Sequence, residues 1–168
     1  VLAQILEEKQ KEYGHPIYLV SDEPYRKLAY GIEVPYLTDY YRNTIVVYSY
    51  SKALSIPGER IGYVAMQPDI DDFADMVAGL TASMRYLGYV NAPSLQQKML
   101  LKCVDASVDI SIYEETRNIL YDGLTQMGYT CIHPDGAFYL FMKAPTADDK
   151  AFVAEAKKHH LLIVPASS

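Results

Sequence analysis

The sequence predicts an α/β fold, in which part of a mostly parallel sheet with flanking helices is followed by a smaller α+β domain. Three observations predict it. Short apolar segments of the strand type alternate with amphipathic helical segments over the first two-thirds of the chain. The last third changes to a helix, a strand pair, a helix and a short strand. Half of the 168 residues are hydrophobic, which supports a sizeable core and excludes a disordered chain.

The elements of the first region follow from local sequence patterns. Apolar residues at helical spacing predict three helices, over residues 1–13, 69–87 and 94–104. Gly14, after the first of them, is a typical helix stop. Apolar or β-branched runs between turn residues predict three buried strands, over residues 16–21, 44–49 and 61–66. Buried strands between helices favour a layered sheet whose strands are mostly parallel.

The last third of the chain predicts a separate small domain. Its elements, in order, are expected to be a helix over 111–127, a strand pair over 129–132 and 137–142, a helix over 151–160 and a strand over 161–164. Pro134 and Gly136 lie in the turn that joins the paired strands. Because the pattern changes near Asp109, we expect two domains, residues 1–108 and 109–168.

Composition and charge limit the partners. The chain has 15 Lys and Arg against 21 Asp and Glu, a net charge of −6, which disfavours binding to nucleic acid. No apolar run approaches the roughly 18–20 residues that cross a bilayer, and no signal-peptide profile is present at the N-terminus. Cys103 and Cys131 lack disulfide or zinc-ligand spacing, so we expect two buried thiols in a reducing, cytoplasmic compartment. No metal site is expected, because metal-ligand spacing is absent from His15, His133, His159 and His160.

Polar side chains gather next to the predicted strands. Residues 21–25 follow the first strand, 49–52 follow the second, and 57–60 precede the third. Ligands of open α/β sheets bind at the carboxyl ends of the strands, so these segments are expected to meet at one crevice. Each segment alone has an ordinary structural interpretation: Tyr25 packed at the sheet edge, a helix cap at Ser49 or Ser51, and a surface pair between Arg60 and Glu59. Their combination favours a binding site.

These segments resemble the fold-type-I pyridoxal phosphate (PLP) enzymes, specifically the class I/II aminotransferases of the aspartate aminotransferase superfamily. The motifs that carry the resemblance are Asp22-Glu23-Pro24-Tyr25, Ser49-Tyr50-Ser51-Lys52-Ala53 and Pro57-Gly58-Glu59-Arg60-Ile61-Gly62-Tyr63. Their order and spacing match the family, with Asp22 thirty residues before Lys52 and Arg60 eight after it. Residues 136–140 are similar to the family's small-domain strand. The resemblance covers nearly the whole chain.

The resemblance implies a role for each polar residue. Lys52 would be the catalytic residue: its primary amine forms a Schiff base with the PLP aldehyde and then carries a proton. Asp22 would face the pyridine nitrogen and keep it protonated, and Tyr25 would donate a hydrogen bond to the ring oxygen. Gly58 and Gly62 would allow the backbone to turn sharply beside the cofactor. The phosphate would be held by Ser49, Ser51 and Arg60.

The implied activity is transfer of an amino group between an L-amino acid and a 2-oxo acid by a cytoplasmic homodimer. In that family, residues 1–108 correspond to the later part of the PLP-binding large domain and 109–168 to a small domain that is truncated at its C-terminus. An Asn-Pro-x-Gly motif would precede Val1, and a carboxylate-binding arginine would follow Ser168. We therefore expect a piece of a longer protein that by itself binds PLP weakly and has no transaminase activity.

Three alternatives stay open at this point. A carbon–sulfur β-lyase or a cyclising synthase of the same superfamily would use the same residues. A ligand-sensing domain of a regulator would keep the fold without catalysis. Ser49-x-x-Lys52 also matches the nucleophile motif of penicillin-recognising acyl enzymes, but the companion motifs Ser-Asp-Asn and Lys-Thr-Gly are absent from the sequence.

Overall fold

The computed structural model describes residues 1–167, and the chain divides into two compact units, Val1–Val108 and Asp109–Ser168. The helices and 3-10 turns of the first unit are α1 (Leu2–Tyr13), η1 (Leu37–Asp39), α2 (Tyr50–Ala53), η2 (Pro57–Glu59), α3 (Phe73–Tyr86) and α4 (Ser94–Cys103). Its strands are β1 (Leu19–Asp22), β2 (Thr44–Ser49) and β3 (Gly62–Met66). The second unit contains α5 (Ile110–Gln126) and α6 (Asp149–Lys158). No helix in this described part of the chain is long and apolar enough to span a membrane.

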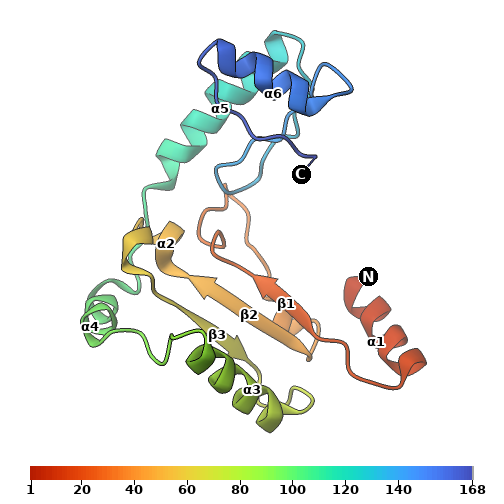
Figure 1. Cartoon of the computed structure of the whole chain (residues 1–168), viewed down its shortest axis with the longest axis vertical. Helices are drawn as coiled ribbons and strands as arrows, with labels where there is room; N and C mark the ends of the chain where they lie inside the picture. Colours follow the sequence, from red (N-terminus) through yellow and green to blue (C-terminus); the bar gives the residue numbers. More distant parts are fainter. Residues whose placement is uncertain (168) are drawn as a thin grey trace. The chain divides into compact units, whose positions relative to one another are not determined.

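The α/β class predicted from the sequence is confirmed, although the sheet is mixed. Its strand order is β1-β2-β3 (Figure 1). β1 runs parallel to β2, with Asp22 opposite Val47, whereas β3 runs antiparallel, with Gly62 opposite Ser49. Parallel neighbours are joined by a long crossover connection, which is usually a complete α-helix. Residues 50–61 form only a four-residue helix and a 3-10 turn, so β3 returns antiparallel to β2.

The middle strand is the centre of the core. β2 covers the predicted residues 44–49, and its first three residues and Tyr48 are buried. The other buried hydrophobic side chains of the first unit are Leu28, Tyr30, Tyr41, Ala53, Ile61 and Ile70. Among the described residues of the second unit, Ala156 on α6 is the hydrophobic residue that is buried. Cys103 and Cys131 are free but only half-buried, not buried as the sequence suggested.

Three strand predictions were wrong in part. β1 begins at Leu19 rather than at residue 16, because the carbonyl oxygen of Ile17 accepts a hydrogen bond from the Tyr41 hydroxyl at 2.5 Å instead of joining the ladder. Residues 161–164 form no strand, since the first amide of this segment donates to Ala156 in α6. The predicted strand pair is reduced to one antiparallel bridge between Cys131 and Met142.

The third helix also begins later than predicted, at Phe73 rather than at residue 69. Asp72 has a left-handed backbone, with φ of 55°, so a right-handed helix cannot start before it. The preceding residue, Asp71, donates its amide hydrogen to Oδ1 of the buried Asn43 at 3.0 Å. The segment before α3 is therefore held against the sheet as a loop.

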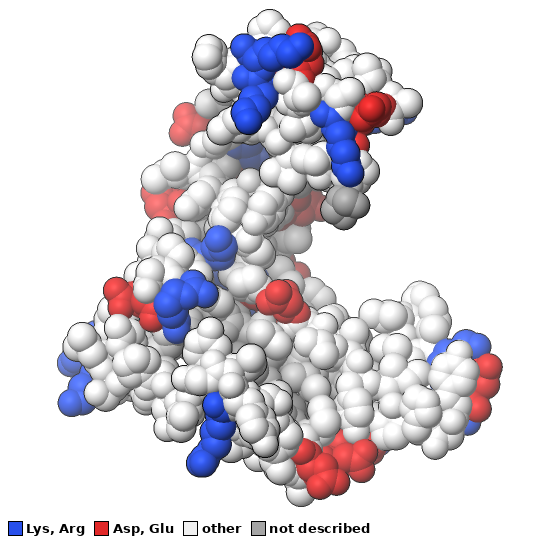
Figure 2. Space-filling view, viewed as in Figure 1, with Lys and Arg blue, Asp and Glu red and all other residues white. Residues whose placement is uncertain are grey.

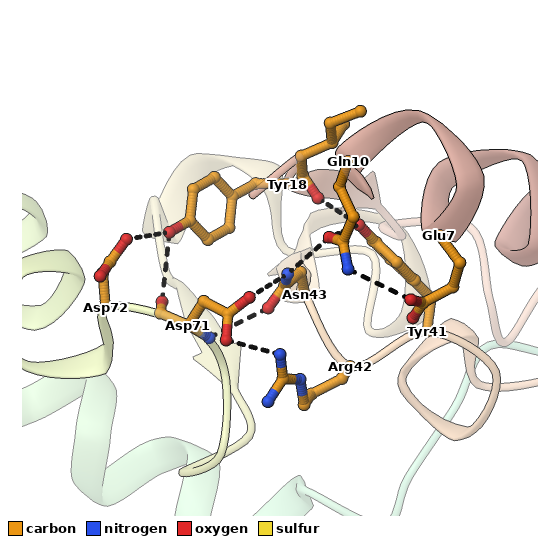
Figure 3. Close-up of polar contacts among 9 residues, drawn as sticks. Glu7, Gln10, Tyr18, Tyr41, Arg42, Asn43, Asp71 and Asp72 are labelled. Carbon is orange, nitrogen blue, oxygen red and sulfur yellow. Dashed lines mark hydrogen bonds and ion pairs between the residues drawn. The ribbon is translucent and has the colours of Figure 1, made fainter. Parts of the chain in front are cut away.

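Asn43 is the centre of a polar network at the amino end of β2 (Figure 3). Its side chain is 1% exposed, and Nδ2 donates to Oδ2 of Asp71 at 2.9 Å and to Oε1 of Gln10 at 3.3 Å. Arg42 adds an ion pair to Asp71 at 2.5 Å. A buried polar group is stable only when its hydrogen bonds are made. This network therefore fixes α1, β2 and the start of α3 to one another.

Candidate active site

Asp22 and Ser49 are the last residues of two neighbouring parallel strands. β1 ends at Asp22 and β2 ends at Ser49, so both lie at the carboxyl edge of the sheet. Asp22 is in register with Val47, and residues in register project to the same face. Ser49 is two residues further along β2, so it shares that face. The register thus directs both side chains toward the same face of the sheet.

Lys52 and Tyr25 meet beside this edge. Lys52 lies on α2, the single-turn helix that follows β2, and Tyr25 lies in the turn that follows β1. The Nζ atom of Lys52 is 5.8 Å from the centroid of the Tyr25 ring, and both side chains are half-buried. The amine and the phenol that the sequence analysis selected therefore lie together, although they are 27 residues apart in the sequence.

The two serines are also brought together. The Ser49 hydroxyl accepts a hydrogen bond from the Ser51 amide at 3.2 Å and so caps α2. It also lies 2.7 Å from the Ser51 hydroxyl and donates to it. The structure thus shows the capping role that the sequence offered as an alternative. A hydroxyl has one donor and two acceptor positions, so a cap does not exhaust its capacity for a ligand.

Arg60 is held within its own turn. Its Nη1 donates to the carbonyl oxygen of Pro57 at 2.8 Å, and within residues 1–167 no hydrogen bond joins it to Ser49 or Ser51. The part of the chain that the structure describes also contains no ion pair between Arg60 and Glu59, whose Oε2 accepts a hydrogen bond from Gln96 at 2.9 Å. Arg60 is exposed and lies in the same unit as the two serines.

The loop that follows Lys52 has an unusual backbone. Ser55 and Arg60 have left-handed conformations, with φ of 55° and 49°. Residues other than glycine adopt this region at a cost of about 1–2 kcal/mol, and such residues cluster at ligand-binding sites. The sequence carries no signal for these conformations, because neither residue is of the type that favours them.

The two glycines selected from the sequence differ in what they do. Gly62 lies so close to β2 that a Cβ atom would come within 2.2 Å of the Tyr48 carbonyl oxygen. It therefore has to be glycine for β3 to pair with the end of β2. Gly58 has open space around its missing Cβ atom and no positive φ, so the prediction that it permits a sharp turn is not supported.

Two groups of residues near the site were not identified from the sequence. Glu23 and Arg26 form an ion pair of 2.6 Å whose side chains are 9% and 12% exposed. The second group is an aromatic cluster in which ring centroids lie 5.1–6.0 Å apart, formed by Tyr48, Tyr50 and Tyr63. Burial raises the pKa of Tyr48 and of Tyr63, with smaller contributions from neighbouring tyrosines. The signal for the ion pair was its spacing of opposite charges at i, i+3.

The donor set at this edge fits PLP in its chemistry. A primary amine can bind an aldehyde, and a carboxylate can hold a proton on a pyridine nitrogen. A phenol suits the ring oxygen, and hydroxyls with a guanidinium suit a phosphate. Four of these groups lie at or beside the ends of β1 and β2: Asp22, Tyr25, Ser49 and Lys52.

Comparison with known proteins points to one family. Residues 2–168 match the family model described as "Aminotransferase class I and II". An aspartate aminotransferase from Geobacillus stearothermophilus is 34% identical over 144 residues, which are 80% of this chain and 35% of the relative. The chain thus spans about a third of that relative's length.

Solved structures agree. A crystal structure of an aminotransferase from Eubacterium rectale matches with a TM-score of 0.93 and 54% identity, covering 97% of this chain and 41% of that one. A crystal structure of an aspartate aminotransferase from Thermotoga maritima matches with a TM-score of 0.76 and 26% identity, and the match covers 99% of this chain and 43% of that one. The resemblance inferred from three short motifs is confirmed, and the chain belongs to the class I and II aminotransferase family.

Proposed function

We propose that this chain contributes the lysine-bearing part of the active site of a PLP-dependent aminotransferase, which moves an amino group between an L-amino acid and a 2-oxo acid. The family depends on PLP. The observation that carries the proposal is the approach of Lys52 Nζ to the Tyr25 ring, at the sheet edge where Asp22 ends β1. Residues 1–108 would be the later part of the PLP-binding domain, and 109–168 part of the small domain.

Each residue would have one task. When bound, PLP supplies an aldehyde that takes up amino groups and a ring that accepts electrons from the substrate's α-carbon. Lys52 would hold the cofactor covalently through Nζ and would carry the proton that leaves the α-carbon. The Asp22 carboxylate would keep the ring nitrogen protonated, and the Tyr25 phenol would donate to the ring oxygen. The phosphate would be bound by Ser49, Ser51 and Arg60, for which Arg60 would have to release Pro57.

The remaining features of the proposal concern the whole protein. We infer a cytoplasmic homodimer from the family. The net charge of −6 disfavours nucleic acid as a partner, and no membrane partner is proposed. The identity of the amino acid is left open. Transamination and β-elimination are distinguished by their products, since only transamination converts the added 2-oxo acid into an amino acid.

The proposal is tested by reduction with borohydride after PLP is added to the full-length protein. We expect a phosphopyridoxyl group on Lys52, located by mass spectrometry of the proteolytic peptides, and no label in Lys52→Ala. Lys27→Ala is the matched control, because Lys27 is a half-buried lysine of the same unit that contacts backbone carbonyl oxygens of Val104 and Ala106. It should keep the label on Lys52.

Two results would contradict the proposal. One is labelling that is unchanged in Lys52→Ala, which would mean that PLP reacts with surface lysines in general. The other is acylation of Ser49 by a β-lactam, which would favour the acyl-enzyme alternative.

A further inference from the structure

Arg26 follows Tyr25 directly in the turn after β1, and its side chain is 12% exposed. Its guanidinium has four partners from two segments: Oε2 of Glu23 at 2.6 Å, the carbonyl oxygen of Val34 at 2.5 Å, that of Pro35 at 3.0 Å, and the ring of Tyr36, whose centroid is 3.9 Å away. An arginine has five donors in a planar fork and a flat face that stacks on aromatic rings. One side chain thus joins the turn after β1 to the loop of residues 34–36.

Glu23 connects this arginine to the sheet. Its Oε1 accepts a hydrogen bond from the Ser21 hydroxyl at 2.8 Å, and its amide donates to the carbonyl oxygen of Val47 in β2 at 2.8 Å. Burial works to raise the pKa of Glu23, but the hydrogen bonds from Arg26 and Ser21 outweigh burial and hold the pKa below its usual value. The carboxylate is therefore ionised at neutral pH and remains paired with Arg26.

The pair lies on the opposite side of the strand from Asp22. Successive side chains of a strand project to opposite faces, so Ser21 and Glu23 share one face and Asp22 projects to the other. The contact between Ser21 and Glu23 agrees with this alternation. Arg26 is therefore placed to hold the backbone of residues 22–25 from the face opposite to the Asp22 side chain.

We propose that Arg26 is a positioning residue, which holds Asp22 and Tyr25 in the geometry that PLP requires. This inference rests on the proposed function. Movement of the turn would shift the Tyr25 ring relative to Lys52 Nζ, which is now 5.8 Å from the ring centroid. Lysine cannot replace Arg26, because one ammonium group cannot reach Glu23 and two backbone carbonyls while it also stacks on a ring.

The experiment compares Arg26→Lys with Arg117→Lys in the full-length protein. Arg117 is a matched control in the second unit. It pairs with Glu114 three residues earlier at 3.0 Å, donates to the carbonyl oxygen of Pro134 at 2.8 Å, and is 10% exposed. Both variants keep the charge and lose the planar fork, so a loss of melting temperature is expected in both.

The first readout is the pH at which the visible absorbance of bound PLP changes. A phenol that donates to the ring oxygen favours the unprotonated form of the bound cofactor, so its displacement raises this midpoint. We expect an upward shift of about 0.5–1 pH unit in Arg26→Lys, equivalent to one hydrogen bond, and no shift in Arg117→Lys. The second readout is hydrogen exchange of residues 22–28 in the PLP-free protein, which we expect to be faster only in Arg26→Lys.

An unchanged midpoint in Arg26→Lys, with PLP still on Lys52, would overturn the positioning role and leave the proposed function intact. A wild-type protein that takes up no PLP would overturn both. If Arg26→Lys does not fold, Glu23→Gln is measured in the same way, because it removes the charged partner of Arg26 and keeps the shape of the side chain. The same upward shift supports the inference, and an unchanged midpoint overturns it.

Discussion

Tyr48 and Tyr41 are similarly buried, 6% and 2% exposed, but their hydroxyl groups differ in what they contact. The Tyr41 hydroxyl donates to the carbonyl oxygen of Ile17, whereas the Tyr48 hydroxyl is buried without a hydrogen-bond partner among the described residues. A buried hydroxyl that makes no hydrogen bond loses its contacts with water, and this desolvation lowers the free energy of unfolding by about 1–3 kcal/mol.

This difference predicts opposite effects of the same substitution. Tyr48→Phe should raise the free energy of unfolding by about 1 kcal/mol or more, because it removes a hydroxyl that has no partner. Tyr41→Phe should lower it by about 1–2 kcal/mol, because it leaves the Ile17 carbonyl unpaired. Urea unfolding of both variants measures the two values. The prediction would be contradicted if Tyr48→Phe lowered the free energy of unfolding as much as Tyr41→Phe does.

The ionised Glu23 predicts a dependence of stability on pH. Its pKa in the folded state is lower than the ordinary 4.5, so its contribution is complete above pH 4.5 and is lost as the pH falls through the folded-state pKa. Glu23→Gln should therefore be less stable than the wild type at neutral pH, and the difference should narrow in acid below the ordinary pKa. Urea unfolding across this pH range measures the difference.

The control is Glu155→Gln, which removes the exposed pair between Glu155 and Lys158. Exposed ion pairs contribute little to stability, so the free energy of unfolding of Glu155→Gln should equal that of the wild type at every pH. A difference between Glu23→Gln and the wild type that stays constant with pH would contradict the assignment of the effect to ionisation.

Helix ends show how local sequence acts at the scale of elements. α1 is followed by Gly14, the helix stop that the sequence predicted, and the φ of Gly14 is 71°, the left-handed conformation typical of such a stop. Gly79 is a different case, since it lies inside α3 with a helical backbone. A Cβ atom at either position would have nothing within 4 Å, so only backbone conformation separates the two sites.

Alanine at these two positions is therefore expected to act in opposite directions. Gly14→Ala should lower the free energy of unfolding by about 1 kcal/mol, because alanine is strained at positive φ. Gly79→Ala should raise it by about 0.5–1 kcal/mol, because alanine restricts the unfolded chain and favours helix. Chemical unfolding followed by circular dichroism measures both. If both substitutions changed the free energy of unfolding in the same direction, packing rather than backbone conformation would determine the effect of alanine at these positions.

Elements that are defined by local pattern alone were predicted well. β2 and α4 lie where β-branched residues and helical spacing placed them. The start of β1 and the start of α3 were not predicted, because each depends on one distant side chain, Tyr41 and Asn43. A side chain that bonds to the backbone across the fold overrides propensity, and a sequence does not show which distant residue will do so.

The surface of the whole chain is large for its mass. Its accessible area is 12034 Å², whereas two separate compact bodies of these lengths would expose about 10,000 Å². Broad areas of the face in Figure 2 carry no charged side chain. Large apolar side chains that are more than half exposed include Tyr86, Leu87, Tyr89, Leu95, Leu101, Ile119 and Leu162. Surfaces of this kind are typical of interfaces with other protein segments.

This exposure predicts the behaviour of the 168-residue chain on its own. We expect it to bind PLP weakly and to transfer no amino groups, because Asp22 and Arg60 are exposed to water and ligand sites require enclosure. Absorbance titration with PLP and an assay of amino-acid turnover measure both properties. A stable visible band together with turnover by the isolated chain would contradict the prediction.

The sequence by itself determined the family and the α/β class, because these depend on residue types at fixed spacing along the chain. Only the tertiary structure decided that β3 runs antiparallel and that Gly62 must approach β2 closely. It also revealed that Arg26 contacts residues 34–36, on the face of β1 opposite to the Asp22 side chain. The reason is physical: spacing specifies which groups are available, but contacts between distant segments form only when the chain packs and their water is removed.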